Sequence, residues 1–429
     1  MDDMKESGIP WLGEIPAEWD SCRIKYVAKI IRGGSPRPIE KFMSDSELGY
    51  NWIKIGDTDK DSRYILHISS KIIPEGLSKT RLVKPGTLLL TNSMSFGEPY
   101  ILNVEGCIHD GWVAFFDYQN IDKIFLYYCL KSSSCRKQFE IFSDGGVVQN
   151  LNIDKIGKTV IAVPSINEQQ RIADFLDEKC GEIDGIVTKI QQEIETLKQY
   201  KQSVISEAVT KGIRPNVPMK DSGISWIGKV PDTWKIQNPK RFFKQRKDKA
   251  SSGMVQYTAS QKYGIITQQE YEQLTGAHIV TVQKGFDILK LVCKGDFVIH
   301  MRSFQGGLEY SRVTGAISSA YVMLIPDKKY ICAEYFKWFF KFPAYIGALR
   351  STSNLIRDGQ AMRFNNFIQI SVIIPPLEEQ REIAAYLDQK CATIDGIISS
   401  KEEQLQTLGA YKKSLIYEYV TGKKRVPTA

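Results

Sequence analysis

The sequence predicts an α/β (α+β) protein with an internal pseudo-twofold repeat, in which two similar mixed domains are joined by two long helices packed as an antiparallel coiled coil. Two observations predict this fold. A helical stretch over residues 164–210 matches residues 375–421 without a gap, with about 22 identities in roughly 47 positions. A segment containing two tryptophans opens each half, so the repeated unit is longer than the helix.

The opening segments read WLGEIPAEW from Trp11 and WIGKVPDTW from Trp226. Tryptophans and prolines in a stretch without periodicity are typical of an ordered wrap, because the large rings gain most when they are buried. The alternative, an exposed recognition peptide, would leave these rings bare. We therefore expect each opening segment to pack against a neighbouring surface.

Each half then continues into a mixed domain. In the first, strands are expected within 50–58, 84–93, 112–118 and 159–163, with a helix over 123–142 and a glycine turn at 144–146. In the second, strands fall within 294–303 and 318–326 and end at 374, with a helix near 333–349 and a turn at 357–359. The loops diverge, as TNSMSFGEPY (91–100) and HMRSFQGGLE (300–309) illustrate. We interpret the domains as two copies of one recognition domain with different specificities. The alternative is that the loop sequences have drifted apart without any effect on function.

The helices carry a heptad seam, because their apolar residues recur at steps of four and three. A helix of roughly 40 residues reaches about 60 Å and needs a partner to cover its apolar stripe. The simplest partner for each helix is the helix of the other repeat, packed against it as an antiparallel pair. The seam alone would also suit a parallel pair. The alternative is that each helix caps its own domain. The predicted seam residues are Leu176, Ile183, Ile190, Ile194, Leu197, Leu387, Ile394, Leu405 and Leu408.

These elements divide the chain of 429 residues, for which two or more domains are expected, into four segments. We expect a first mixed domain over residues 1–163 and a central helical region over 164–215. A second mixed domain is expected over 216–374 and a C-terminal helical region over 375–429.

Composition narrows the class of protein. The 57 Lys and Arg residues against 49 Asp and Glu give a formal charge of +8, which permits a nucleic-acid partner without requiring one. No apolar run reaches the length of a membrane span, and no signal peptide opens the chain. The eight cysteines form no CxxC pair and the four histidines do not cluster. We expect a cytoplasmic protein with reduced thiols, no membrane partner and no metal site.

The doubled plan resembles the specificity subunits of Type I restriction–modification systems. The residues that carry the resemblance are the two tryptophan segments, the Pro-x-x-x-Glu-Gln sequences at 164–169 and 375–380, and the Ile-Asp pairs at 183–184 and 394–395. The resemblance covers essentially the whole chain. It implies two target-recognition domains, each reading one half of a bipartite asymmetric DNA target, with the paired helices as the spacer.

The same resemblance implies the partners and the division of labour. The partners would be double-stranded DNA, two copies of a methyltransferase (modification) subunit docked on the helices, and a restriction/translocase subunit recruited through that complex. The chain would be no enzyme by itself and would bind no cofactor. S-adenosylmethionine, ATP and Mg are expected on the partner subunits, which would carry out adenine methylation and ATP-dependent DNA cleavage.

Base edges are read chiefly by Arg, Lys, Asn and Gln, whereas phosphate contacts set the register. Two reading domains must lie about one duplex turn apart, roughly 34 Å, a distance that a stiff helical pair can hold. The basic run 240–247 contains interleaved phenylalanines, although a strand or helix with one solvated basic face is the alternative. Any candidate can instead be an ordinary surface residue. The candidates are Asn92, Gln149, Asn150, Lys244, Arg246, Lys247, Arg302, Gln305, Arg357, Gln360, Arg363 and Asn365.

Two rival functions fit less well. A self-contained DNA methyltransferase would need an Asn/Asp-Pro-Pro-Tyr loop. The most similar sequence in the chain, Asn238-Pro239-Lys240, lacks the aromatic residue. The sequence also has no GxxxxGK[ST] motif for binding ATP. Asp57, Asp59 and Asp61 lie close together in one turn, but no Glu-x-Lys follows them at the spacing of a nuclease site. A coiled-coil scaffold that does not bind DNA would leave two large matched domains unexplained. We predict no catalytic residue.

Overall fold

The computed structural model describes residues 3–46, 48–60, 62–93, 96–143, 151–278, 288–352 and 362–427. It separates into two compact units, Met1–Gln191 with Glu402–Ala429 (unit 1) and Gln192–Lys401 (unit 2). The division crosses both long helices, α4 (Ile166–Lys211) and α10 (Leu377–Val420). Each unit therefore contains a mixed domain, the beginning of one long helix and the end of the other. The four segments expected from the sequence, 1–163, 164–215, 216–374 and 375–429, remain a prediction.

Unit 1 begins with a hairpin of β1 (Met4–Glu6) and β2 (Glu14–Pro16), followed by β3 (Asp20–Arg23), which pairs antiparallel with β14 (Val160–Val163). One five-stranded sheet has the order β4 (Lys29–Arg32), β13 (Trp112–Phe116), β10 (Leu88–Thr91), β11 (Pro99–Leu102), β7 (Tyr64–Ile65). The other has the order β5 (Met43–Ser44), β8 (Lys71–Ile72), β6 (Tyr50–Ile53), β12 (Gly106–Ile108), β9 (Arg81–Val83). The helices before α4 are α1 (Lys123–Lys131), α2 (Ser133–Ser143) and α3 (Ile153–Lys158).

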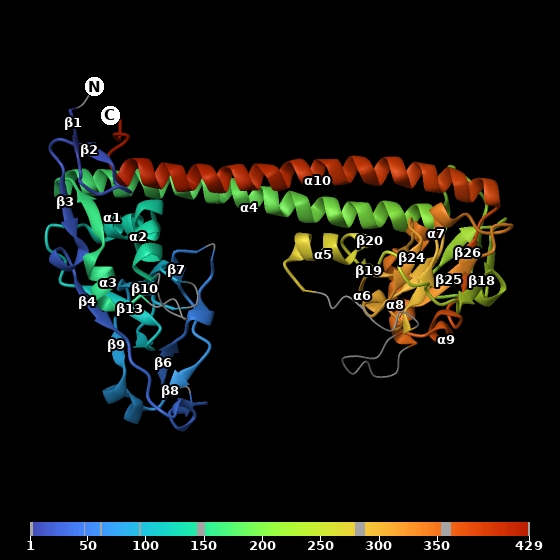
Figure 1. The fold of residues 1–429 in the computed structure, drawn as a ribbon, viewed down its shortest axis with the longest axis horizontal. Coiled ribbons are helices and arrows are strands. Elements are labelled where there is room, and N and C mark those ends of the chain that lie inside the picture. The colour runs from blue at the N-terminus through green and yellow to red at the C-terminus, as the bar shows by residue number, and fades with distance from the viewer. Residues whose placement is uncertain are drawn as a thin grey trace. The chain divides into compact units, whose positions relative to one another are not determined.

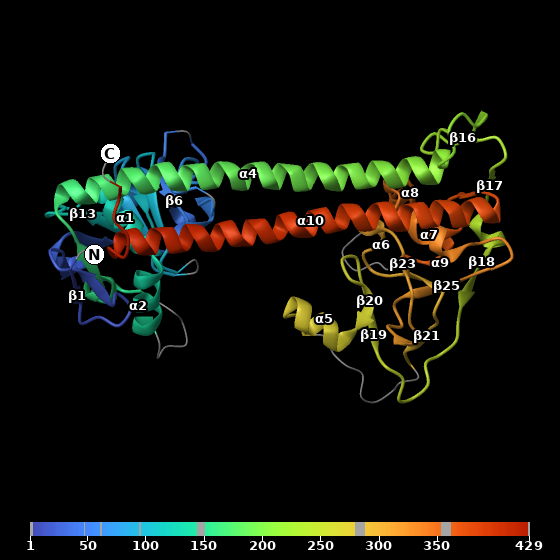
Figure 2. The same cartoon turned by 90° about the horizontal axis from the view of Figure 1, so that it is seen from above.

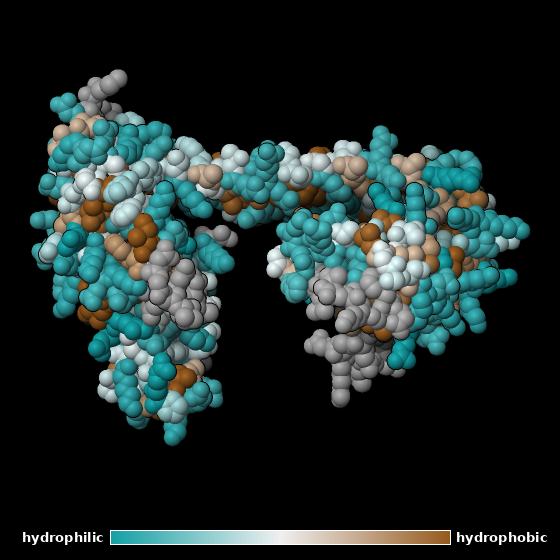
Figure 3. Space-filling view, viewed as in Figure 1, coloured by the Kyte–Doolittle hydropathy of each residue, from teal (hydrophilic) through white to brown (hydrophobic). Residues whose placement is uncertain are grey.

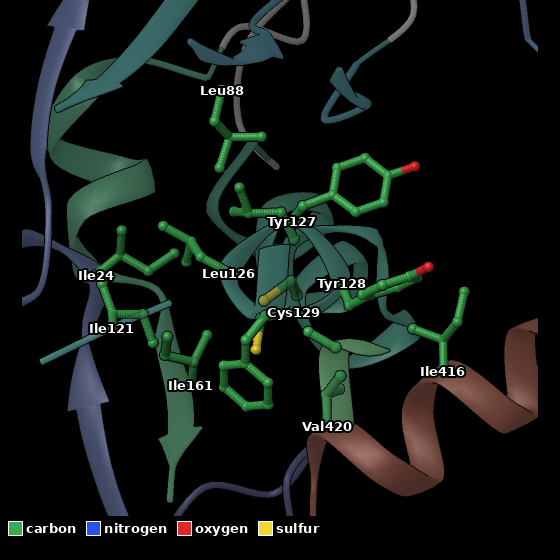
Figure 4. Packing of buried hydrophobic residues seen from close by; sticks show 14 of the residues in the cluster. Ile24, Leu88, Ile121, Leu126, Tyr127, Tyr128, Cys129, Ile161, Ile416 and Val420 are labelled. Carbon is green, nitrogen blue, oxygen red and sulfur yellow. The ribbon is translucent and has the colours of Figure 1, made fainter. Parts of the chain in front are cut away.

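The core of unit 1 joins the mixed domain to both long helices. Figure 4 shows Leu126 and Tyr128 of α1 packed with strand residues such as Ile161, while Ile416 and Val420 of α10 lie at the edge of the same cluster. The last turns of α10 thus contribute side chains to the core of the domain that stands first in the sequence. The alternative in which each helix only caps its own domain does not describe this unit.

Unit 2 repeats the frame with a different outer part. The hairpin β15 (Met219–Asp221) and β16 (Lys229–Pro231) and the pair β17 (Lys235–Gln237) and β26 (Val372–Ile374) match those of unit 1. A four-stranded sheet has the order β18 (Phe243–Arg246), β25 (Val322–Pro326), β22 (Phe297–Ile299), β23 (Glu309–Tyr310). Two further antiparallel pairs are the hairpin of β19 (Tyr257–Ser260) and β20 (Gly264–Thr267), and β21 (Lys290–Val292) with β24 (Gly315–Ile317). The remaining helices are α5 (Gln268–Thr275), α6 (Ser303–Gly306), α7 (Ala333–Phe339), α8 (Pro343–Ser351) and α9 (Phe364–Phe367).

Five short 3-10 helices complete the description; they are η1 (Ile24–Tyr26), η2 (Ile39–Lys41), η3 (Ile55–Asp57), η4 (Pro74–Lys79) and η5 (Pro239–Arg241). The predicted strands are present but shorter, and each predicted helix of the mixed domains is broken in two. In unit 1 the break is at Ser132, whose hydroxyl donates to the carbonyl of Cys129 at 2.6 Å. In unit 2 the second helix begins at Pro343, which has no N–H to continue the first. The glycine turns expected at 144–146 and 357–359 lie outside the described residues.

Both opening segments pack against the first turn of a long helix, as expected, through their second tryptophan, whereas their first tryptophan is half-buried. Trp19 and Trp234 have no exposed surface. The indole N–H of Trp19 donates to Glu168 Oε2 at 3.0 Å, and that of Trp234 donates to Glu379 Oε2 at 2.9 Å. A carboxylate in the first turn of a helix is also stabilised by the helix dipole. The glutamate of each Pro-x-x-x-Glu-Gln sequence therefore fixes an opening segment to the start of its helix.

The glutamine of the same sequence fixes the helix to the mixed domain. In unit 1 the buried Gln169 amide donates to the carbonyls of Pro164 (2.9 Å) and Asn120 (3.1 Å), and its Oε1 accepts from the backbone N–H of Asp122 at 2.7 Å. In unit 2 the buried Gln380 repeats this pattern. Its partners there are the carbonyls of Pro375 and Tyr330 and the N–H of Cys332, at 2.9, 2.9 and 2.8 Å.

Within each unit α4 and α10 run side by side in opposite directions (Figure 1 and Figure 2). The direction is set by reciprocal ion pairs, because Lys412 contacts Asp184 at 2.6 Å in unit 1 and Lys201 contacts Asp395 at 2.6 Å in unit 2. The aspartates belong to the two Ile-Asp pairs of the repeat. The helices are therefore antiparallel, and each repeat supplies one acid and one base.

The seam residues are not equally buried. Six of the nine have almost no exposed surface: Leu176, Ile183, Ile190, Ile194, Leu387 and Ile394. The other three, Leu197, Leu405 and Leu408, are only half-buried, which corrects the expectation of a uniformly buried seam. Leu176 and Leu387 also belong to the core cluster of their own unit, so the mixed domain encloses them in addition to the helix pair.

This difference predicts unequal costs of truncation. Leu176→Ala should lower the free energy of unfolding by about 2–5 kcal/mol, because it empties a fully enclosed site. Leu387→Ala, its counterpart in unit 2, should lower the free energy of unfolding by a similar amount. Leu408→Ala should lower it clearly less, because Leu408 is only half-buried. Urea denaturation of the three variants checks this. Equal losses at Leu176 and Leu408 would contradict the burial pattern.

Candidate nucleic-acid interface

Four of the sequence-predicted reading residues lie outside the described residues: Gln149, Asn150, Arg357 and Gln360. A fifth, Asn92, is described and is 1% exposed. Its side-chain amide donates to the carbonyl of Asp110 at 3.0 Å, and its backbone N–H donates to the carbonyl of Gly111 at 3.0 Å. Asn92 follows the buried strand β10, so its side chain holds the end of that strand and is not presented on the surface.

The surface beside Asn92 carries two arginines that the sequence did not single out. The carboxylate of Asp110 accepts from the Ser35 hydroxyl at 2.6 Å and from Arg37 Nη2 at 3.2 Å, while Arg32 Nε donates to the Asp110 carbonyl at 2.9 Å. The Ser35 hydrogen bond, followed by the Arg37 one, lowers the pKa of Asp110 against the opposing effect of burial. The Arg37 side chain remains 80% exposed, so this arrangement fixes a cation at the surface.

A hollow adjoins this cation, lined by residues 35–40 together with Trp52 and His109. Burial lowers the pKa of His109 from its ordinary value of 6.5, although Asp110 and Asp57 act in the opposite direction. Backbone N–H groups point at both ring nitrogens, that of Gly111 at 2.7 Å from Nδ1 and that of Ile55 at 3.3 Å from Nε2. A protonated imidazole has no acceptor for them, so these contacts, like burial, favour the neutral ring in the lining of the hollow.

In unit 2 the basic run 240–247 covers the end of η5 and the edge strand β18, whose residues alternate between the two faces of the sheet. Phe243 is in the core, where its ring meets those of Phe336 and Phe367 at 5.3 and 5.4 Å. The predicted Lys244 and Lys247 are exposed, at and just after this strand. This is the strand with one solvated basic face, and its core phenylalanine is not available to stack on bases.

The predicted Arg246 is engaged within the domain. Its guanidinium donates to both oxygens of Asp296, at 2.7 and 3.0 Å, and to Asp248 at 2.9 Å. The hydrogen bonds that it donates to Asp296 raise the pKa of this arginine, which therefore keeps its charge. Asp296 is 2% exposed, so Arg246 compensates the charge of a buried carboxylate.

The predicted Arg302 and Gln305 are exposed around the short helix α6, and the structure brings a second loop beside them. Gln261, in the turn between β19 and β20, donates through Nε2 to the carbonyl of Arg302 at 2.6 Å. The next residue, Lys262, is exposed and lies over the ring of Tyr263 at 5.1 Å. Residues 261–263 together with Arg302 and Gln305 form what we call the α6 surface.

Sequence reasoning missed the hairpin half of the α6 surface. The signal was present, since QYTASQKYGIITQ alternates polar and apolar residues around a turn that ends in glycine. Gly264 adopts φ +71°, a left-handed conformation that favours glycine. The predicted Arg363 and Asn365 are also exposed, at the beginning of α9, where Asn366 Oδ1 accepts from the Arg363 N–H at 3.0 Å.

Comparison with protein families decides what this duplicated frame is. The family model described as Type I restriction modification DNA specificity domain matches residues 16–196 and again residues 228–407. The chain belongs to this family. Each match of the specificity domain begins within an opening segment and continues into a long helix, so the family repeat and the structural repeat coincide.

Individual specificity subunits resemble the chain over nearly its whole length. A putative type I restriction enzyme MjaX specificity subunit from Methanocaldococcus jannaschii is 24% identical, covering 97% of this chain and 96% of its own. The EcoKI specificity subunit from Escherichia coli (strain K12) is 22% identical, covering 96% and 90%. A solved chain described under complex assembly and conformational transition of the type I R-M system superposes with a TM-score of 0.70 at 13% identity, covering 96% and 99%. That likeness supports the fold of the specificity subunits.

None of the helices in the described ranges has the length and apolar character needed to cross a membrane.

The partly buried His109 of unit 1 predicts a dependence of stability on pH. The folded pKa of His109 lies below its unfolded value, so the unfolded chain binds more protons between these two values. The free energy of unfolding should therefore fall as pH drops through 6.5 toward the folded pKa, and His109→Gln should remove this component. Urea denaturation followed by tryptophan fluorescence between about pH 5 and pH 7.5 tests it. An unchanged slope in the variant would contradict the assignment.

Proposed function

We propose that the chain selects the DNA target of a Type I restriction–modification complex, and that each unit reads one half of a bipartite, asymmetric double-stranded sequence. The observation that carries this proposal is the combination of a repeated frame with different outer surfaces. The Trp–Glu contact, the glutamine contacts to backbone groups and the Lys–Asp pair each occur twice, at equivalent positions of the two repeats. A frame kept twice with two unlike surfaces suits two unlike half-sequences.

The outer surfaces differ in architecture as well as in side chains. Unit 1 places the five-stranded sheet β5-β8-β6-β12-β9 between β4 and β13 in the sequence, whereas unit 2 has the β19–β20 hairpin and α5 at the comparable place. The exposed cations differ accordingly. Unit 1 offers Arg37 beside its hollow, and unit 2 offers Lys262 and Arg302 on the α6 surface. Such groups can read base edges or contact phosphates.

The proposal assigns catalysis to partner subunits. Two copies of a methyltransferase subunit would dock on the helical regions, and a restriction/translocase subunit would join through them. S-adenosylmethionine, ATP and Mg would be bound by those partners, in the cytoplasm. A self-contained methyltransferase is the rival proposal, and titration of the purified chain with S-adenosylmethionine in a calorimeter distinguishes the two, because measurable binding would favour the rival.

Sequencing of methylated adenines tests the proposal directly. A host that carries this chain with its methyltransferase partner should acquire methylation at one asymmetric sequence made of two short blocks with a fixed gap. A host that carries the partner without this chain should lack that methylation. Methylation at the same sites in both hosts would contradict a role in target selection.

The α6 surface predicts which variant changes the target. If Arg302 reads a guanine, Arg302→Ala should cost about 1–3 kcal/mol of binding and relax one base position only. A uniform loss for all sequences, together with a smaller salt dependence, would make it a phosphate contact. Binding of the full chain to a library of duplexes distinguishes these outcomes. Arg381→Ala is a suitable control, because Arg381 is exposed on α10 and pairs with Glu378 of the same helix.

A further inference from the structure

The α6 part of the α6 surface is a short segment that begins and ends with buried polar side chains. His300 follows β22 and Glu309 begins β23, and each is 4% exposed. Between them Arg302 and Gln305 are exposed, whereas Ser303 is fully buried. The exposed candidates for base contacts are therefore carried by a segment whose two ends are fixed in the interior of unit 2.

A lysine between α7 and α8 holds the end of this segment. Lys341 Nζ donates to Glu309 Oε1 at 2.5 Å and to the backbone carbonyl of Gly306, the last residue of α6, at 3.0 Å. The Glu309 side chain is only 6% exposed, so water and salt screen this ion pair weakly. Because one ammonium group contacts both the carboxylate and α6, it fixes α6 relative to the two helices behind it.

The packing around this lysine leaves α6 little freedom. α6 packs against α8, and α6, α7 and α8 lie close together in unit 2 (Figure 1 and Figure 2). Gly307 has φ +80°, and a Cβ added there would collide with the carbonyl oxygen of Phe340. At the other end, His300 Nδ1 accepts from the Arg302 N–H at 3.4 Å, and the His300 N–H donates to Ser303 Oγ at 2.9 Å. The backbone that carries Arg302 is therefore held from both sides.

Unit 1 makes a comparable contact around a segment of different sequence. Glu98, just before β11, pairs with Lys131 at 2.7 Å and with Arg136 at 3.0 Å. Arg136 also donates to the carbonyl of Phe96 at 2.5 Å. Lys131 is the last residue of α1 and Lys341 lies between α7 and α8, so each unit supplies a cation from the break between its two helices. A carboxylate after the segment and a cation at the helix break thus occur in both units.

We propose that the contacts of Lys341 with Glu309 and Gly306 position α6, so that the DNA target of unit 2 depends on a contact buried behind its reading surface. Lys341 and Glu309 are then positioning residues, and Glu98 has the same role in unit 1. This inference rests on the proposed function and adds residues that set the geometry of reading. Hydrophilic residues predominate on the visible surface of both mixed domains (Figure 3), which suits a polar ligand such as DNA.

Reading of base edges tolerates little displacement. The hydrogen bonds that distinguish one base from another depend on distance and angle, and a reading group displaced by about 1 Å loses them. A phosphate contact made by a long, flexible cation depends much less on such a shift. Displacement of α6 should therefore reduce the discrimination between bases more than the total affinity. This difference separates a positioning role from a general structural one.

Lys341→Gln in the full chain tests the proposal. The variant and the wild type, each in complex with the methyltransferase subunit of the same system, are bound to a library of duplexes. Discrimination between the preferred base and the others should fall about tenfold at positions of one block of the target, while the other block is read as before. Lys341→Arg keeps a cation that can reach Glu309, so it should restore most of the discrimination.

Lys337→Gln is the matched control. Lys337 belongs to α7, four residues before Lys341, and pairs with Asp388 of α10 at 2.6 Å. Its side chain is 16% exposed, so this substitution also removes a partly buried ion pair, but one made to a long helix and not to α6. Lys337→Gln should leave the base preferences of both blocks unchanged.

The two glutamates provide a reciprocal test. Glu309→Gln keeps the shape of the side chain and removes its charge, so it should relax the same block as Lys341→Gln. Glu98→Gln removes the carboxylate that holds Lys131 and Arg136 in unit 1. It should relax the other block and leave the first unchanged.

The outcomes separate this inference from the proposed function. A uniform loss of affinity for all sequences in Lys341→Gln, with unchanged base preferences, would overturn the positioning role alone. Equal relaxation by Lys337→Gln would also overturn it, because the loss of any ion pair in unit 2 would then suffice. Failure of both Lys341→Gln and Glu309→Gln to fold would contradict it too, since the contact would then hold the core. A wild-type complex that binds all duplexes equally would overturn the proposed function as well.

Discussion

The structure depends on how the first turn of each long helix is held. Glu168 and Glu379 accept the indole N–H of a buried tryptophan, and the next residue, a glutamine, uses both its donors and its acceptor on buried backbone groups. A buried amide is stable only when its hydrogen bonds are made. The opening segment, the mixed domain and the helix therefore have one compatible arrangement, and the repeat applies it twice.

The end of the other helix completes each of these junctions. In unit 1 Arg425, just beyond α10, pairs with Glu168 and Glu18 and lies over the Trp19 ring at 5.3 Å. In unit 2 the equivalent Arg214, just beyond α4, pairs with Glu382 at 2.7 Å instead. The two junctions have the same architecture but differ in the contacts of the arginine. Arg425 combines two carboxylates with the face of an indole ring, whereas the ion pair of Arg214 is with Glu382.

Much of the frame was predictable from the sequence because its signals are local or repeated. The ranges 164–210 and 375–421 agree with α4 and α10 to within a few residues, since identity between the repeats and the heptad pattern mark the same positions. The breaks at Ser132 and Pro343 were missed, although a proline at the start of α8 is a local signal. The candidate site was less predictable. The partner of Arg246 is fifty residues away in the sequence, and the burial of Asn92 depends on the loop of Asp110, so neither could be read from its neighbours.

The core of unit 1 contains Leu415, Ile416, Tyr419 and Val420 from the last turns of α10, although the rest of that core lies within residues 15–183. Unit 2 is a single continuous stretch, 192–401. During synthesis on the ribosome, unit 2 therefore has its whole sequence before unit 1 does, even though unit 1 starts first. The domain made first must wait with an uncovered apolar surface until the final turns of α10 emerge.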